Sequence, residues 1–222
     1  MLKQFKPMKS VIEEFYNQLL EDKDGHRYRS WEHCFNAFNN TDLPNDILSL
    51  HLGFYLASWG MYRGSSGLLW KDYTIHLKAV EIIKNQPELK VTPSNLYPEI
   101  SSIFSCSNEL KQYYSSLVYF NNKKHKNISA TDTLLTKILL GVYGVIPAFD
   151  RYFLLGTKSE LNISSFSKKN IEKLYEYARE PAHKKDIVSC QSFIKKNSGI
   201  WYPPMKILDM YFWQIGFKKD VK

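Results

Sequence analysis

Apolar residues recur along most of this chain at the three- and four-residue spacing of an α-helix, and this periodicity limits the folds open to it. The alternation of apolar and polar residues that is typical of a half-buried strand is rare. The expected helices cover about 11–20, 28–38, 44–59, 75–85, 96–120, 130–146, 168–179, 184–196 and 204–217. Residues 121–127 and 161–169 are polar and are expected to be loops. We therefore predict an all-α fold, a compact irregular helical bundle with at least seven helices and no sheet of three or more strands.

The chain is expected to form one domain. Its 222 residues are within the usual size of a single domain, and 44% of them are hydrophobic, which is ample for a packed core. No internal repeat, low-complexity tract or long linker divides it. We therefore predict a single helical domain over residues 1–222. The helix over 44–59, which Pro44 can open, is apolar almost all round, so it is expected to be the central buried helix.

The chain carries an excess of positive charge. Thirty lysines and arginines stand against 22 aspartates and glutamates, and the formal net charge is +8. An excess of this size favours polyanionic partners. We therefore expect nucleic acid as the partner.

The apolar and cysteine content bears on the compartment. The longest apolar stretches, Ile138–Phe149 and Leu52–Tyr62, are shorter than the about 20 residues that a membrane span needs. The charged N-terminal region lacks the apolar core of a signal peptide. The three cysteines, Cys34, Cys106 and Cys190, are widely spaced, which fits a reducing compartment. We expect a cytoplasmic protein with no membrane partner, and the oligomeric state is left open.

The most informative segment begins with the helix expected over 131–146. Its apolar residues gather on one face, which is expected to pack in the core. Lys137 falls on a different face together with Thr133, Gly141 and Gly144. Small residues on that face would let another backbone or a ligand approach the lysine closely. The alternative is that Lys137 extends along the helix surface to water, as lysines on helix flanks usually do.

An aspartate follows this helix closely. Pro147 is expected to end the helix, and the chain from Gly144 to Asp150 is long enough for the carboxylate to return to Lys137. A partly desolvated lysine has a lowered pKa and can act as a nucleophile, and a nearby carboxylate can orient it. The alternative is that Asp150 is the N-cap of a helix that starts at Arg151.

Three segments resemble parts of a known family. Thr136–Leu140 (TKILL) followed by Pro147–Asp150 (PAFD) is similar to the hairpin lysine and downstream Pro-x-x-Asp of helix-hairpin-helix DNA glycosylases, especially the 8-oxoguanine glycosylase-like branch. Trp59–Gly64 is similar to a tryptophan–glycine segment of bacterial members of that branch, and Leu208–Trp213 resembles their final helix. The chain lacks the glycine-rich hairpin of the family, and 127–131 (NISAT) stands in its place.

The resemblance implies a helix-hairpin-helix glycosylase-like fold and a DNA glycosylase-like activity that excises a flipped base. It implies that Lys137 attacks the sugar C1′ and that Asp150 assists it. It favours DNA over RNA as the partner, and no metal or organic cofactor is implied.

Two further segments are candidates for phosphate contacts. The glycines and serines of Met61–Gly67 offer amides and hydroxyls to an anion, although a flexible turn would have the same composition. A basic stretch over 123–126 precedes the helix that carries Lys137, and its alternative is a solvated loop. The residues predicted to contact nucleic acid are Arg63, Ser65, Ser66, Lys123, Lys124 and Lys126.

Two other functions stay open. Arg27 and His33 are separated by five residues, with Arg29 between them, which resembles the arginine–histidine signature of HEPN ribonucleases with defence or toxin roles. In such a site the histidine moves a proton without a metal while the arginine binds the scissile phosphate. The alternative is an amphipathic helix whose Trp31 packs inside while His33 faces water. The third function is a non-catalytic module that binds nucleic acid or protein.

Overall fold

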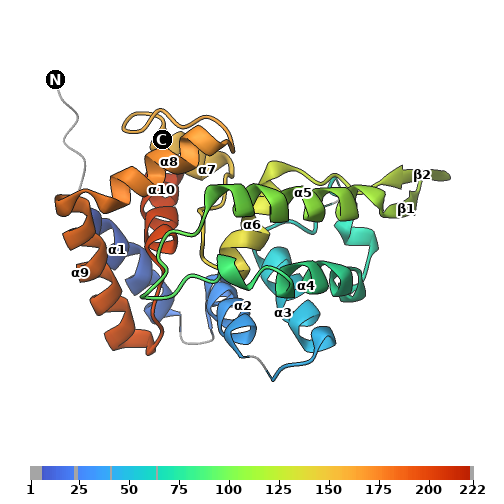
Figure 1. Ribbon diagram of the computed structural model, residues 1–222, viewed down its shortest axis with the longest axis horizontal. Helices are drawn as coiled ribbons and strands as arrows, with labels where there is room; N and C mark the ends of the chain where they lie inside the picture. Colours follow the sequence, from blue (N-terminus) through green and yellow to red (C-terminus); the bar gives the residue numbers. More distant parts are fainter. Residues whose placement is uncertain (1–6, 23–24, 41, 64, 221–222) are drawn as a thin grey trace. The chain divides into compact units, whose positions relative to one another are not determined.

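The computed structural model describes residues 7–22, 25–40, 42–63 and 65–220, which form ten α-helices and one two-stranded hairpin (Figure 1). The helices are α1 (Met8–Glu21), α2 (Ser30–Asn39), α3 (Asn45–Ser58), α4 (Leu77–Lys84), α5 (Ile100–Ser116), α6 (Asp132–Val142), α7 (Arg151–Thr157), α8 (Lys168–Arg179), α9 (Pro181–Ser198) and α10 (Pro204–Asp220). The strands are β1 (Val118–Asn121) and β2 (Lys124–Asn127), and 3-10 turns cover Arg27–Arg29, Leu68–Trp70, Tyr73–His76 and Pro87–Leu89. The predicted all-α fold is confirmed.

The backbone contacts divide the chain into two compact units. The middle unit comprises Arg27–Tyr143, and the flanking unit comprises the chain on either side of it. The middle unit holds α2 to α6 and the β-hairpin, and the flanking unit holds α1 and α7 to α10.

The flanking unit is built around α10, which contacts α1, α7, α8 and α9. The contact with α7 is unusually close because a glycine lies on each helix at the crossing. A Cβ atom on Gly156 would lie 1.9 Å from the carbonyl oxygen of Phe212, and one on Gly216 would lie 1.8 Å from that of Tyr152. Any larger residue at either position would therefore force the two backbones apart.

In the middle unit the most buried helix is α6, which contacts α2, α3 and α5. Every residue from Leu134 to Val142 is buried, and the indole nitrogen of Trp31 donates a hydrogen bond to the carbonyl oxygen of Leu140 at 2.9 Å. The prediction that the helix over 44–59 is the central one is wrong. Leu50 and Phe54, four residues apart on α3, are 50% and 55% exposed, because the other sides of that helix already pack against α2, α4 and α6.

The predicted loop over 121–127 is also wrong, because this segment belongs to the β-hairpin. Asn122 and Lys123 form the two-residue turn with φ angles of 50° and 60°, the left-handed conformation that tight hairpins need and that asparagine tolerates. The amide of Ile128 donates to the carbonyl oxygen of Leu117 at 2.9 Å and extends the ladder by one bond. The hairpin continues from the end of α5 and projects beyond the helices of its unit (Figure 1).

Candidate nucleic-acid interface

The structure brings together the two segments that were predicted to contact phosphate. Tyr119 of β1 lies against Gly67 so closely that a Cβ atom there would be 2.5 Å from its ring. Gly67 also has a φ of +82°, which favours glycine. The amide of Ser129 donates to the carbonyl oxygen of Ser66 at 3.2 Å. The Met61–Gly67 loop thus anchors the base of the β-hairpin.

The pairing register gives the hairpin two different faces. Tyr119 pairs with Lys126 and Asn121 pairs with Lys124, so these residues share one face. Phe120 pairs with His125 on the opposite face.

The ring centroids of Phe120 and His125 lie 5.2 Å apart, and the two rings are at 54° to each other. Val118 lies on the same face and is 43% exposed, whereas Phe120 is 60% exposed. The hairpin therefore presents lysines on one face and an exposed aromatic pair on the other.

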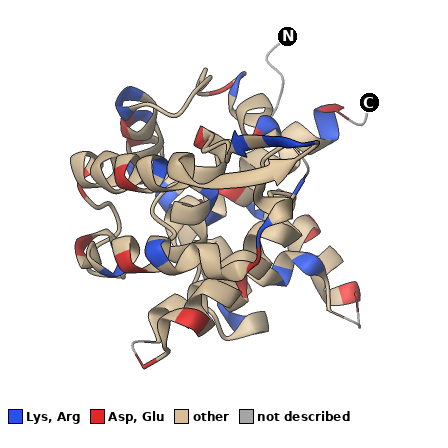
Figure 2. Cartoon of the chain, turned by 90° about the vertical axis from the view of Figure 1, so that its right-hand side faces the viewer, with Lys and Arg blue, Asp and Glu red and all other residues tan. Residues whose placement is uncertain are grey.

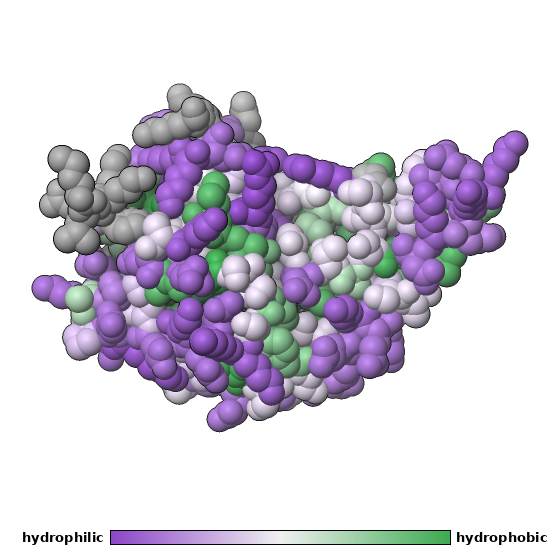
Figure 3. Space-filling view, turned by 90° about the horizontal axis from the view of Figure 1, so that it is seen from above, coloured by the Kyte–Doolittle hydropathy of each residue, from purple (hydrophilic) through white to green (hydrophobic). Residues whose placement is uncertain are grey.

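Positive charge gathers on β2 and the turn. Lys124 and Lys126 belong to β2 and Lys123 to the turn, and all three are exposed. Figure 2 shows the lysine-bearing strand in blue beside an uncharged one. In Figure 3 hydrophilic and hydrophobic atoms lie next to each other at the right-hand end, where the hairpin projects. Among the residues that the structure describes, none of these three lysines forms an ion pair with a carboxylate, so their charge is available to a partner.

The residues of the Met61–Gly67 loop differ in what they offer. The hydroxyl of Ser66 lies 2.6 Å from the carbonyl oxygen of Met61 and accepts from the amide of Leu68 at 3.2 Å, so the turn itself uses it. Arg63 folds back over Gly60, where a Cβ atom would lie 3.0 Å from its guanidinium. Arg63 and Ser65 are exposed beside the hairpin base.

The buried His76 contacts this loop through Tyr62. The Nε2 of His76 lies 2.7 Å from the hydroxyl of Tyr62, and its Nδ1 lies 2.6 Å from the hydroxyl of Tyr114 on α5. The imidazole is fully buried, and burial lowers its pKa to about 4. Burial also raises the pKa of Tyr62 to about 12. The sequence alone did not reveal this hydrogen-bonded row of Tyr62, His76 and Tyr114, because no local pattern links residues so far apart.

Lys137 lies in the middle unit and is only 4% exposed, so the alternative that it extends to water is wrong. Its ammonium donates to the carbonyl oxygen of Trp59 at 3.4 Å and lies 5.2 Å from the centroid of that indole. Trp59 is the C-cap of α3, so the lysine places positive charge at the negative end of that helix. The space that Gly141 leaves is filled by Tyr55, whose ring a Cβ atom there would meet at 2.4 Å. Gly144 lies beyond the end of α6, with a φ of +66°.

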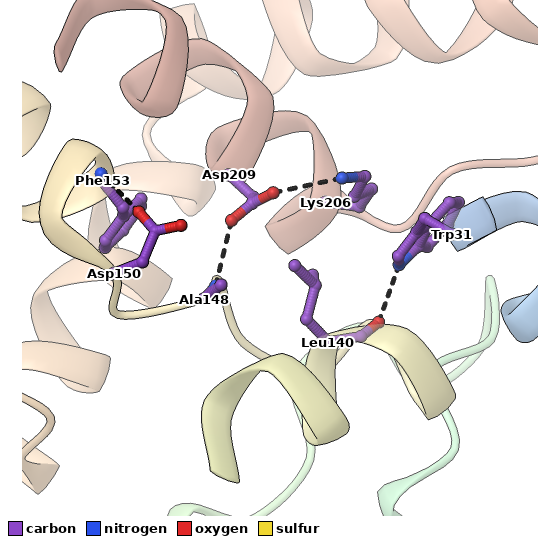
Figure 4. Close-up of polar contacts among 7 residues, drawn as sticks. All are labelled: Trp31, Leu140, Ala148, Asp150, Phe153, Lys206 and Asp209. Atoms are coloured by element: carbon purple, nitrogen blue, oxygen red, sulfur yellow. Dashed lines mark hydrogen bonds and ion pairs between the residues drawn. The ribbon is translucent and has the colours of Figure 1, made fainter. Parts of the chain in front are cut away.

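Asp150 lies in the flanking unit, where it is the N-cap of α7 (Figure 4). One carboxylate oxygen accepts from the amides of Tyr152 at 3.1 Å and Phe153 at 3.0 Å. The interpretation of Asp150 as a helix cap is therefore confirmed.

A lysine–aspartate pair that sequence reasoning did not single out lies on α10 of the same unit. Asp209 accepts from the ammonium of Lys206 at 3.1 Å and from the amide of Ala148 at 3.0 Å (Figure 4). Both side chains are buried, and burial raises the pKa of the Asp209 carboxyl although Lys206 opposes this change. The spacing of three residues on a helix was the signal that could have revealed the pair.

The arginines and histidine of the ribonuclease hypothesis lie at the start of the middle unit. Arg27 donates to the hydroxyl of Tyr28 at 3.3 Å, and Arg29 lies 3.6 Å from the carboxylate of the buried Glu32. His33 is exposed on α2 while Trp31 is buried, as the amphipathic alternative predicts.

Within the described residues, no three histidine, cysteine, aspartate or glutamate side chains gather as a metal would require. The cysteines are buried and form no disulfide with one another. No helix in the described part of the chain combines the length and the apolar character needed to cross a membrane.

The chain was also compared with known proteins. No protein-family model, no curated protein and no solved structure matches it.

Proposed function

We propose that the protein binds nucleic acid through the β-hairpin and the Met61–Gly67 loop beside it. The observation that carries this proposal is the group of three exposed lysines, Lys123, Lys124 and Lys126, on a hairpin where no carboxylate of the described residues pairs with them. Contacts between lysines and phosphates supply essentially all of the affinity in non-specific binding of nucleic acid. Phosphate binding by these side chains needs no change in the fold.

The anchoring of the hairpin supports the same proposal. Because Tyr119 packs on Gly67 and Ser129 bonds to Ser66, the lysines are held on a fixed base rather than on a free loop. Less conformational entropy is lost when a preorganised surface binds. Arg63 and Ser65 lie on the loop at this base and extend the same surface.

The two catalytic hypotheses stay predictions. Base excision would need Lys137 to leave the end of α3 and Asp150 to leave the start of α7. RNA cleavage through Arg29 would need that side chain to exchange Glu32 for a phosphate, and cleavage through Arg27 would need it to leave the hydroxyl of Tyr28. The binding proposal requires none of these changes, so the geometry favours binding over either reaction.

The test replaces Lys123, Lys124 and Lys126 together by glutamine and measures binding to labelled nucleic acid by fluorescence anisotropy at several salt concentrations. The triple variant is expected to lower the slope of log K against log salt by about 3, one for each phosphate contact. The affinity should fall alike for different sequences, because phosphate contacts carry no sequence information.

The matched control replaces three other exposed lysines, Lys184, Lys185 and Lys195 on α9, by glutamine. It removes the same net charge from a different place, and it should leave most of the affinity and of the slope. Equal losses in the two triple variants would mean that only the diffuse charge of the protein matters, and the hairpin would not be the binding site.

A further inference from the structure

The most exposed large hydrophobic side chain among the described residues is Phe120, at 60%. It lies on a strand, and its ring is held beside that of His125 in the register of the hairpin. Exposing an aromatic ring to water forgoes the free energy of burying it. A ring held in place at a projecting tip is suited to a partner that covers it.

The charged residues at the tip indicate what that partner is. The pair of Phe120 and His125 is followed directly by the pair of Asn121 and Lys124, and then by Lys123 in the turn. Lys124 lies on the opposite face of the ribbon from the two rings, but it and Lys123 in the turn fall within about 10 Å of the rings along the ribbon, at about 3.3 Å per residue, so a strand that wraps around the tip meets both. Flat apolar surfaces next to phosphates are what a nucleotide offers, because a base stacks on the ring while its phosphate meets the ammonium.

We infer that the hairpin recognises unpaired bases, and that Phe120, supported by His125, is the stacking platform of a site for single-stranded nucleic acid. In a duplex the faces of the bases are already stacked, and opening a step costs a few kcal/mol. In a single strand those faces are open, and every base has one, so the site is tolerant of sequence. The inference rests on the proposed function, because the lysines bind the phosphates of the strand whose bases stack on the ring.

The test compares a labelled 20-nucleotide oligo(dT), an oligo(U) of the same length and a 20-base-pair duplex at one salt concentration. The wild-type protein is expected to bind the single strands at least about 10-fold more tightly than the duplex. Phe120→Leu, which stays apolar but loses the ring, should weaken single-strand binding by about 5- to 150-fold and leave duplex binding unchanged. Phe120→Tyr should restore most of the affinity.

Phe54→Leu is the matched control, because Phe54 is 55% exposed on a helix of the same unit, and this variant should bind like the wild type. Equal affinity for single strands and duplex, or an unchanged affinity in Phe120→Leu, would overturn the inference. If the triple variant of Lys123, Lys124 and Lys126 binds every nucleic acid as tightly as the wild type, the proposed function is overturned, and the inference with it. Anionic phospholipid vesicles form the last arm, and binding to them that depends on Phe120 while oligonucleotide binding does not would assign the ring to a lipid surface.

Discussion

The buried imidazole of His76 makes the fold sensitive to acid. A neutral imidazole has one donor and one acceptor nitrogen, which matches the two tyrosine hydroxyls that contact it. A protonated imidazole has two donors and a charge, and in this position the charge would be fully buried. Lowering the pH from 7 to 4 is therefore expected to destabilise the protein through this residue.

The magnitude follows from the two pKa values. His76 has a pKa of about 4 when folded, against an ordinary value of 6.5 that we take for the unfolded chain. Because the folded pKa is the lower one, the unfolded state takes up the proton first. The stability that the neutral imidazole contributes is fully present above pH 6.5 and is lost as the pH falls toward 4. The gap corresponds to about 3 kcal/mol at 1.36 kcal/mol for each pH unit.

Urea unfolding followed by circular dichroism between pH 7.5 and 4 measures this loss. His76→Gln cannot titrate, so the free energy of unfolding of the variant should fall by about 3 kcal/mol less than that of the wild type over the same range. His51, whose burial also lowers its pKa, titrates in both proteins and cancels in the comparison. Identical pH profiles would refute the reasoning.

If the glutamine variant does not fold, the wild-type imidazole resonances still test it by NMR. The midpoint of the His76 titration should lie below pH 5. A midpoint near 6.5 would mean that the ring is not buried between the two tyrosines.

Two other predictions concern the buried lysines. Lys137→Gln should lower the free energy of unfolding by about 1–2 kcal/mol, because it removes a buried charged hydrogen bond at the end of α3. If the base-excision hypothesis holds, borohydride should also trap a covalent adduct between the wild-type protein and damaged DNA, and this variant should form none. A wild-type protein that forms no adduct while the variant loses stability would leave Lys137 with a structural role only. Asp209→Asn removes the carboxylate that pairs with the buried Lys206 and should cost about 3–5 kcal/mol in urea unfolding, whereas the double variant Lys206→Met with Asp209→Asn, which keeps an amide oxygen for the Ala148 amide, should recover most of it. A single variant as stable as the double one would contradict the ion-pair account.

The helices could be predicted from the sequence wherever one face was apolar and the ends had strong local signals. The buried face of α1 follows from the spacing of Val11, Phe15 and Leu19, and Pro44 marks the residue before α3. Asp150 could be interpreted as the cap of α7 because an N-cap acts on amides within three residues of itself. These features depend on short-range interactions, which the order of residues determines directly.

The candidate interface could be predicted only as separate pieces. All four residues of β2 are exposed, so it has no alternation of buried and exposed positions and resembles a polar loop in sequence. Its pairing depends on the turn at Asn122 and Lys123. The meeting of Gly67 with Tyr119, and of Tyr62 with His76 and Tyr114, depends on tertiary packing across many residues. Such contacts leave no periodic signal in a single sequence.

The hairpin also has a consequence for self-association. In the described residues β1 and β2 pair only with each other, so the outer edge of each strand keeps backbone amides and carbonyls to which a strand of another molecule could add. Lysine side chains along β2 oppose such growth, because two copies would bring like charges together. The same cations that suit a polyanion therefore also oppose edge-to-edge pairing of two copies, and any modification that neutralises them removes this barrier.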